Sequence, residues 1–267
     1  MHLRLPYILL LSIHGICCMA QKQAKDLPLP ENNNFFVLKH GGIIRGNAEK
    51  PDIALVFTGD EFFEGLTSIT DALAKNQVSA SFFLTGRLYR NPDAKKSIQR
   101  LIRQKHYFGP HSDQHLLYND WSEPDSLLVS RDSFSTDLQA NYRAMEALRI
   151  RHQQKYFIPP YEWWNATIAG WCRDLGITVI SFSPGTATNA DYAFPEMGKA
   201  YRHSDTLLNR LLALEEQSGL NGAMILIHIG TDPRRIDKLY DRLPDLIRVL
   251  KKRGYRFLRV DELLQRQ

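Results

Sequence analysis

Short apolar runs alternate with amphipathic stretches along most of the 267-residue chain. Each run has the length and continuous apolar character of a strand that is buried on both faces. The seven runs predicted as strands are residues 53–57, 80–84, 106–109, 156–158, 177–182, 223–228 and 255–258. Because strands alternate with helical stretches throughout, the pattern predicts a single α/β domain on a parallel sheet, either open or closed into a barrel.

The stretches between these runs carry apolar residues at helical spacing. The predicted helices are residues 66–76, 93–104, 136–151, 167–175, 206–217, a helix with Pro244 in its first turn that ends near Arg253, and a short helix at the end of the chain. Ser135 is the predicted N-cap of the third helix, and Ser204 or Asp205 that of the fifth. Ahead of the first strand, two β-prone runs flank Gly41 and Gly42, which predicts a hairpin that covers one end of a barrel.

The first twenty residues have the composition of a secretory signal peptide. Arg4 precedes an apolar core, residues 7–16, and small residues precede the predicted cut. This core is too short to span a membrane. We therefore expect residues 1–20 to be removed on export to the periplasm or cell envelope. Residues 21–34 are polar and contain two prolines, which predicts a flexible leader, and residues 35–267 are the predicted folded domain.

A lipid anchor is the alternative to simple cleavage, because Cys17 and Cys18 lie close to the predicted cut. Ile16 suits the position before a lipidated cysteine poorly, which favours cleavage without an anchor. Cleavage would leave Cys172 as the one cysteine of the chain, so no disulfide could form within it. An exported protein without disulfides is more typical of a bacterial envelope than of a small disulfide-rich scaffold.

Composition and charge narrow the range of partners. The chain has 43% apolar and 24% charged residues, as expected of a folded globular protein. Its net charge is +5 at pH 7, and the basic residues are scattered rather than gathered in a stripe. The sequence therefore predicts no nucleic-acid partner and no membrane span. It leaves the oligomeric state open.

Polar side chains follow the ends of several predicted strands. The stretch 109–118, GPHSDQHLLY, places His111 and His115 four residues apart after the third strand. Two imidazoles at this spacing can converge on one metal ion. His228 ends the sixth strand. The other polar residues at strand ends are Asp60, Glu61, Glu64, Tyr161, Glu162, Thr186, Thr188, Asn189 and Asp191.

The carboxyl ends of the strands share one face of an α/β barrel, so these residues are expected to meet over one pocket. Two imidazoles and one carboxylate would hold a divalent ion and leave positions open for water and substrate. Asn189 and Asp191 also suit a turn, and we interpret them in that way. Trp121, Trp163 and Trp164 either pack in the core or form a wall on which a sugar ring stacks.

The order of these motifs resembles the polysaccharide deacetylase family, also called the NodB-homology or carbohydrate esterase family 4 domain. The likeness extends from about Asp52 to Leu264. The matching stretches are residues 79–86 (SASFFLTG), 111–115 (HSDQH) and 226–228 (LIH). The family's Arg-x-Pro-Tyr motif appears as IPPY and ends at Tyr161, with Ile158 where the arginine is usual. The resemblance implies a distorted seven-stranded β/α barrel.

The family's first motif, Thr-Phe-Asp-Asp-Gly, is the least well kept, because residues 56–61 read VFTGDE. A match without a gap places Thr58 and Gly59 on the two aspartate positions, of which the first is the base and the second a metal ligand. A shift of two residues places Asp60 and Glu61 there instead. We adopt the shift, because the histidine pair otherwise has no carboxylate nearby. Asp60 is then the predicted metal ligand and Glu61 the predicted base, and the two roles could be exchanged.

The resemblance implies a metal-dependent hydrolase that removes N- or O-acetyl groups from a polysaccharide or oligosaccharide of the cell envelope. The expected ion is Zn²⁺, with Co²⁺ or Ni²⁺ as alternatives. The predicted ligands are Asp60, His111 and His115. Glu61 would take a proton from the bound water, the backbone N–H near Tyr161 would hold the oxyanion, and His228 would protonate the leaving group.

Two alternatives come from the same residues. The replacement of the motif arginine by Ile158, together with the altered first motif, also fits a carbohydrate-binding protein without turnover. A metal hydrolase of a small amide would use the same groups. Acetate release from acetylated oligosaccharides that depends on metal and on His111 would favour the deacetylase over both alternatives.

Overall fold

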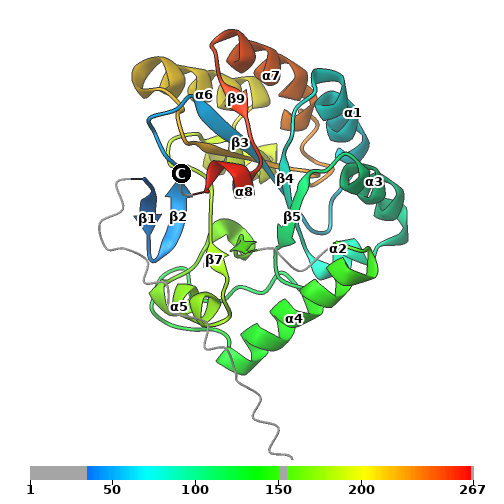
Figure 1. The fold of residues 1–267 in the computed structure, drawn as a ribbon, viewed down its shortest axis with the longest axis vertical. Coiled ribbons are helices and arrows are strands. Elements are labelled where there is room, and N and C mark those ends of the chain that lie inside the picture. The colour runs from blue at the N-terminus through cyan, green and yellow to red at the C-terminus, as the bar shows by residue number, and fades with distance from the viewer. Residues whose placement is uncertain (1–34, 151–154, 266–267) are drawn as a thin grey trace, which may run out of the picture. The chain divides into compact units, whose positions relative to one another are not determined.

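A computed structural model describes residues 35–150 and 155–265 of the chain. The chain divides into residues 1–32 and residues 33–267, and the described residues belong to the second unit. The predicted signal peptide and the predicted leader lie outside the described residues. Within the second unit, strands and helices alternate along the chain (Figure 1).

The central sheet forms around β3 (Asp52–Gly59), whose eight residues are all buried. Its continuous apolar sequence suits a parallel strand, because both faces of a parallel sheet are covered. The strand order is β5–β4–β3–β8, and β9 pairs in parallel with the first residues of β3. The partner strands are β4 (Ser81–Leu84), β5 (Tyr107–Pro110), β8 (Met224–His228) and β9 (Arg256–Phe257).

The remaining strands form two separate pairs. β1 (Val37–Lys39) and β2 (Gly42–Arg45) form the predicted antiparallel hairpin around a turn at His40 and Gly41. β6 (Tyr156–Phe157) and β7 (Thr178–Val179) pair in parallel. Each of the seven predicted runs therefore contains a strand, and the α/β class of the prediction is confirmed.

The strand β7 is much shorter than the predicted run 177–182. Beyond β7, successive backbone N–H groups donate to carbonyl oxygens of β6, β2 and β8, at 2.9, 3.0 and 2.9 Å. A segment that bonds to three strands in turn does not keep one partner long enough to extend a strand. These bonds connect the smaller pairs to the central sheet, and the closure of the strands into a barrel stays a prediction.

The helices lie outside the strands (Figure 1). The α-helices are α1 (Leu66–Asn76), α2 (Gly86–Tyr89), α3 (Pro92–Arg103), α4 (Arg131–Ala147), α5 (Ala166–Asp174), α6 (Ser204–Ser218), α7 (Leu243–Lys252) and α8 (Val260–Leu263). The 3₁₀ helices are η1 (Pro160–Glu162), η2 (Thr188–Tyr192), η3 (Pro195–Ala200) and η4 (Leu239–Arg242). Among the α-helices, α2 was not predicted, because four residues are too few to show helical periodicity.

The predicted start of α4 is wrong. The helix begins one turn earlier, and Ser130 rather than Ser135 is its N-cap. The hydroxyl of Ser130 accepts a hydrogen bond from the backbone N–H of Ser133 at 3.1 Å. Phe134 is the one large apolar side chain in this first turn, and it is fully buried. A single apolar residue among polar ones gives no periodic signal, which explains the late prediction.

The predicted cap of α6 is also wrong, by one residue. Ser204 is the first residue of the helix, and His203 is the N-cap. Nδ1 of His203 accepts a hydrogen bond from the backbone N–H of Asp205 at 3.3 Å. The imidazole here takes the place of the hydroxyl or carboxylate that usually caps a helix, so the usual residue preferences point to its neighbours.

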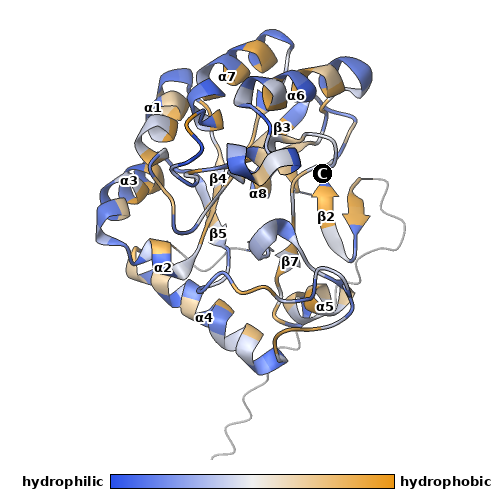
Figure 2. Cartoon of the chain, turned by 180° about the vertical axis from the view of Figure 1, so that it is seen from behind, coloured by the Kyte–Doolittle hydropathy of each residue, from blue (hydrophilic) through white to orange (hydrophobic). Residues whose placement is uncertain are grey.

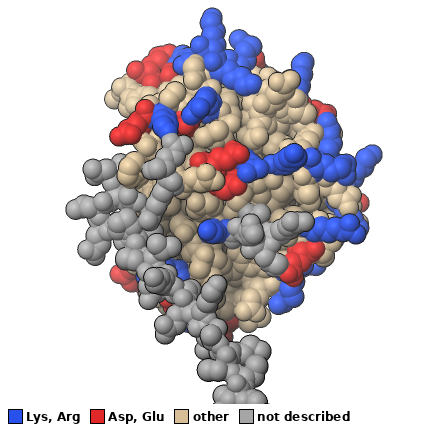
Figure 3. Space-filling model, in the orientation of Figure 1, with Lys and Arg blue, Asp and Glu red and all other residues tan. Residues whose placement is uncertain are grey.

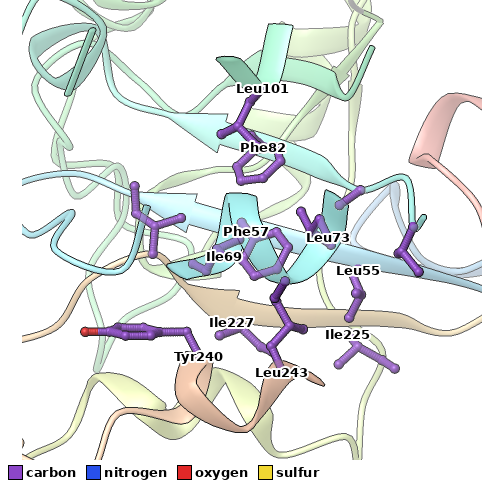
Figure 4. Close-up of a cluster of buried hydrophobic side chains, with 14 of the residues drawn as sticks. Leu55, Phe57, Ile69, Leu73, Phe82, Leu101, Ile225, Ile227, Tyr240 and Leu243 are labelled. Carbon is purple, nitrogen blue, oxygen red and sulfur yellow. The ribbon is translucent and has the colours of Figure 1, made fainter. Parts of the chain in front are cut away.

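The main core lies between the central sheet and helices α1, α3 and α7 (Figure 4). Phe82 of β4 stacks on Phe57 of β3 and Phe108 of β5, with ring centroids 5.0 and 5.6 Å apart. Leu73 and Leu101 bring the helices onto these rings. Burial of one such side chain contributes about 1.5–3 kcal/mol. Figure 2 shows hydrophobic and hydrophilic colours on the same helices α4 and α7, as expected of helices with one buried face.

Helix length and surface charge can be compared with the sequence in the part of the chain that the structure describes. None of the helices there combines the length and the apolar character that a bilayer span needs. On the face drawn in Figure 3, acidic side chains lie among the basic ones. This distribution agrees with the scattered charge of the sequence.

Candidate active site

The candidate site lies at the carboxyl edge of the central sheet. His111 follows β5 directly, and His228 is the last residue of β8. Thr58, near the end of β3, is the register partner of His228. Because β3, β5 and β8 are parallel, the residues at their ends meet at one edge, as the sequence predicts.

The predicted histidine pair is confirmed as a pair of neighbouring imidazoles. The ring centroids of His111 and His115 are 5.0 Å apart. Nδ1 of His111 donates a hydrogen bond to the carbonyl oxygen of Ile158 at 2.7 Å, which leaves the lone pair on Nε2. Burial lowers the pKa of His111 to about 3 and that of His115 to about 4. Both rings are therefore neutral near pH 7, the form that binds metal ions or accepts protons.

The loop that carries the pair is held by α4. The carboxylate of Asp137 accepts hydrogen bonds from the hydroxyl of Ser112 at 2.6 Å and from the backbone N–H groups of Asp113 and Gln114 at 2.8 and 3.0 Å. Asp113 pairs with Arg90, at 2.6 Å between Nη1 and Oδ1. Asp113 therefore stabilises the loop and is not a spare carboxylate of the site.

Asp60, the predicted metal ligand, is occupied by protein partners. Its Oδ1 accepts hydrogen bonds from the hydroxyl of Thr85 at 2.8 Å and from Nε of Arg87 at 2.5 Å, and Arg87 also pairs with Oδ2. Nδ1 of His115 lies 3.9 Å from Oδ2. Burial alone would raise the pKa of Asp60, but the hydrogen bonds from Arg87 and Thr85 hold it below its usual value.

The predicted ligands do not form a three-ligand metal site as they stand. Residues 35–150 and 155–265 contain no group of three or more His, Cys, Asp or Glu side chains arranged to hold a metal ion. The carboxylate of Asp60 would first have to leave Arg87. The side chains as they stand therefore do not fit a metal ion held by all three predicted ligands. The binding of such an ion stays a prediction. Glu61, the predicted base, is exposed at the bend after β3.

The two positions that the ungapped motif match assigns to aspartates are filled differently here. The hydroxyl of Thr58 is buried and has no hydrogen-bond partner among the described residues. A Cβ atom on Gly59 would lie 2.3 Å from Cδ1 of Ile229, so a larger side chain has no room at this position. Ile158, at the place of the motif arginine, is fully buried in an apolar cluster.

The other side of the site holds an imidazole and a carboxylate in contact. Nδ1 of His228 lies 2.5 Å from Oδ1 of Asp191, and its backbone N–H donates to Oδ2 at 3.0 Å. Burial alone would lower the pKa of His228, but the charge of Asp191 and, more weakly, that of Glu162 raise it above its usual value. Asp191, which we interpreted as a turn residue, is thus the fully buried partner of His228.

A strained turn brings Glu162 to the same place. Tyr161 and Glu162 are consecutive residues in the left-handed region, with φ of 60° and 51°. Such a conformation is costly for residues with a side chain, and it is often retained at functional sites. Burial, reinforced by Asp191 and opposed by His228, raises the pKa of Glu162 to about 7.

Aromatic side chains border the histidine pair. The ring of Tyr161 is 4.4 Å from that of His115 and 5.6 Å from that of Trp121, between centroids. Trp121 is 53% exposed and stacks on Trp163 with a centroid distance of 5.3 Å. Trp164 is only 4% exposed and belongs to the core. The two alternatives for the tryptophans therefore apply to different residues. Trp164 belongs to the core, whereas Trp121 and Trp163 form an accessible aromatic surface beside the site.

The fold and the site together define an α/β protein with a histidine-rich site at the carboxyl edge of a parallel sheet. A family model of polysaccharide deacetylases matches residues 45–180, just over half of the chain. The chain belongs to the polysaccharide deacetylase family, as its motifs suggested.

Comparisons with individual proteins agree with this family. The chain is 28% identical to an uncharacterized 30.6 kDa protein of Geobacillus stearothermophilus, over 86% of this chain and 77% of that one. It is 24% identical to the peptidoglycan N-acetylmuramic acid deacetylase of Bacillus subtilis, over 86% and 78% of the two chains. A carbohydrate esterase family 4 pseudoenzyme from Bacillus anthracis has the same fold, with a TM-score of 0.65 and 23% identity over 85% of this chain and 70% of that one.

Proposed function

We propose that this protein removes acetyl groups, N- or O-linked, from an acetylated glycan of the cell envelope. The observation that carries the proposal is the contact between His228 and Asp191, which lies at the same sheet edge as His111 and His115. An imidazole that keeps a proton near neutral pH can protonate an amine or alcohol as it leaves. The peptidoglycan deacetylase among the relatives supports an envelope glycan as the substrate class.

The aromatic surface supports a sugar as the ligand. Trp121 and Trp163 stack on each other and adjoin Tyr161, which in turn borders His115. Flat apolar rings with polar edges bind pyranose faces well, because the ring buries the C–H groups of a sugar while the hydroxyls stay in water. A glycan lying on this surface would bring an acetyl group to the histidines. The backbone N–H near Tyr161 is the proposed donor to the oxyanion.

Export to the envelope is part of the proposal and rests on composition alone. Residues 1–20 have the apolar core and small residues of a cleaved signal. Amino-terminal sequencing of the protein purified from its own cells tests this point. A mature chain that begins at Gln21 supports export, and an intact amino terminus contradicts it.

The direct test is acetate release from acetylated chito-oligosaccharides, acetylated xylo-oligosaccharides and peptidoglycan fragments. We expect release from at least one of these, and its loss in His228→Gln. Parallel reactions with Zn²⁺, Co²⁺, Ni²⁺ and a chelator examine the predicted metal dependence, with His111→Ala as the matched variant. Release of acetate from none of the substrates, under any of these conditions, contradicts the proposal.

A second candidate is a glycan-binding protein without turnover. It is favoured by the combined changes at Thr58, Gly59 and Ile158, which remove the residues usual in the family's motifs. The two candidates differ in a simple measurement. Binding of acetylated oligosaccharides that depends on Trp121, without acetate release, favours the binding protein.

A further inference from the structure

We propose that Glu162 is the catalytic base of this site. The proposal rests on the deacetylation proposed above and names the residue that takes the proton from water. Neither the sequence motifs nor the family comparison assigns a role to this residue. It was noted in the sequence only as a polar residue after the fourth strand.

The other candidates for the base are each unsuitable on structural grounds. Thr58 has a neutral hydroxyl, which is a poor proton acceptor. Asp60 already accepts hydrogen bonds from Arg87 and Thr85, so its carboxylate is committed to these partners. Glu61 is exposed to solvent beyond the end of β3. Asp191 accepts two hydrogen bonds from His228 and is committed to it.

Glu162 belongs to the turn that borders the histidine pair, because the ring of Tyr161, the residue before it, lies 4.4 Å from that of His115. The charged groups that face it are His228 from β8 and Asp191 from η2, and Arg235 acts on His228 from the loop after β8. Among the described residues, the Glu162 carboxylate interacts with these groups at longer range and forms no side-chain hydrogen bond or ion pair. The carboxylate and the imidazole therefore act on each other without contact. The two groups would supply a base and an acid to the same site.

The proposed step balances as a hydrolysis. The Glu162 carboxylate takes one proton from water while the water oxygen forms a bond to the acetyl carbon, and the carbonyl π electrons move to the oxygen. The C–N or C–O bond to the sugar then breaks, and its electron pair leaves with the sugar nitrogen or oxygen. His228 gives that atom a proton from Nε2. Acetic acid and the free amine or hydroxyl are the products, and the proton on Glu162 passes through solvent to restore His228.

The energetics agree with this assignment. A base works best when its pKa lies near the working pH, and Glu162 has a pKa of about 7, where an ordinary glutamate has 4.5. The strained turn at Tyr161 and Glu162 keeps the carboxylate in its costly position. A side chain that only stabilises the fold through hydrogen bonds does not require a strained backbone. The free energy spent on this turn is expected where a side chain is held in position for a reaction.

The first test compares Glu162→Gln with the matched control Glu216→Gln, at an exposed glutamate of α6. With the substrate from which the wild type releases acetate, we expect Glu162→Gln to lower kcat by about 10²–10⁴ and to change KM little. Glu216→Gln should stay within about threefold of the wild type, since exposed substitutions have small effects. Formate should restore part of the activity of Glu162→Ala, because it supplies a carboxylate in the vacated space, and it should not stimulate the wild type.

The pH profile separates a base from a positioning residue. Wild-type kcat should rise through about pH 7 as Glu162 loses its proton, and this acid limb should be missing from the residual activity of Glu162→Gln. A Glu162→Gln variant with more than a tenth of wild-type kcat and an unchanged acid limb overturns the assignment. In that case acetate release by the wild type would still uphold deacetylation. Absence of release by the wild type instead overturns deacetylation, and the role of Glu162 with it.

A second measurement needs no substrate. An unfolded glutamate loses its proton near pH 4.5, whereas folded Glu162 keeps its proton up to about pH 7. The folded state therefore loses stability relative to the unfolded state as the pH rises between these values, and it carries the full cost at pH 8. Glu162→Gln should melt several degrees higher than the wild type at pH 8 and at the same temperature at pH 4. Equal melting temperatures at both pH values overturn the proposal.

Discussion

The two sides of the site differ in whether their charges are satisfied. On the β3 side, Asp60 is paired with Arg87 and Thr85, and Gly59 is covered by Ile229. On the β8 side, Asp191 is paired with His228, and the carboxylate of Glu162, which acts on His228 from η1, has no hydrogen bond among the described residues. The carboxylate of Asp60 is thus stabilised by its partners. The carboxylate of Glu162 is instead held where ionisation is unfavourable. Proteins retain such unfavourable charges mainly where they are used.

This difference has a consequence for the reaction. In the family pattern, the base and one metal ligand follow the first strand, at the positions filled here by Thr58 and Gly59. Ile158 stands where the family's Arg-x-Pro-Tyr motif has its arginine. The arginine that would orient the base is therefore missing as well. The two aspartates and the arginine of the family pattern are therefore absent together. This is expected if no proton is transferred at the end of β3. The proposal for Glu162 moves that step from the end of β3 to η1.

The largest expected effect comes from the β8 side. His228→Gln removes the acid and should lower acetate release by about 10²–10⁴, because the leaving nitrogen or oxygen then departs without a proton. The matched control is His203→Gln, since His203 is an exposed histidine at the start of α6. Initial rates of acetate release with equal enzyme concentrations measure both. Equal activities of the two variants would show that His228 takes no part in the reaction.

The next effect is on stability and concerns the β3 side. Gly59→Ala places a Cβ within 2.3 Å of Ile229, and overpacking of this kind costs about 1–3 kcal/mol in the free energy of unfolding. The double variant Gly59→Ala, Ile229→Ala should recover part of the loss, because the second change removes the clashing carbons. Gly170→Ala in α5 is the control, since its Cβ would meet nothing closer than 3.7 Å. Urea denaturation of the four proteins tests the expectation, and a stable Gly59→Ala contradicts it.

Much of the fold was predictable from local patterns, and the exceptions have local reasons. Residues 53–57 of β3 are apolar without interruption because the strand is buried on both faces, so the sequence alone reveals it. β7 was predicted too long because the bonds beyond it go to three different strands. The N-caps Ser130 and His203 were missed, the first because its helical turn has one apolar residue and the second because histidine is an unusual cap.

The site was predictable only in part. His111, His115 and His228 were expected to meet, because they end parallel strands of one sheet. Asp191 was taken for a turn residue, because its contact with His228 depends on how η2 packs against β8, and no local pattern shows this. The pairing of Asp60 was equally hidden, because its partner Arg87 lies on α2, a helix too short to be predicted.

A smaller effect should separate the aromatic surface from the core. Trp121→Ala removes the exposed ring and should raise KM by about 2- to 10-fold at unchanged kcat, as expected for the loss of about 0.5–1.5 kcal/mol of stacking. Trp164→Ala should instead lower the melting temperature, because that ring is buried. Steady-state kinetics and thermal melts of both variants measure the contrast. A Trp121→Ala variant with unchanged KM would show that the glycan does not bind on this surface.

The smallest expected effect concerns Arg87 and the predicted metal. Arg87 is almost half exposed, and an ion pair in such a place is worth about 0–1 kcal/mol. Arg87→Gln frees one side of Asp60, so the affinity for Zn²⁺ should rise by up to about fivefold if Asp60, His111 and His115 are the ligands. Isothermal titration of the variant and the wild type with Zn²⁺ measures the change, and Arg100→Gln, which breaks an exposed ion pair with Asp71, is the control. If Arg87→Gln leaves Zn²⁺ affinity unchanged while His111→Ala abolishes it, Asp60 is not a ligand, and the β3 side takes no part in holding the ion.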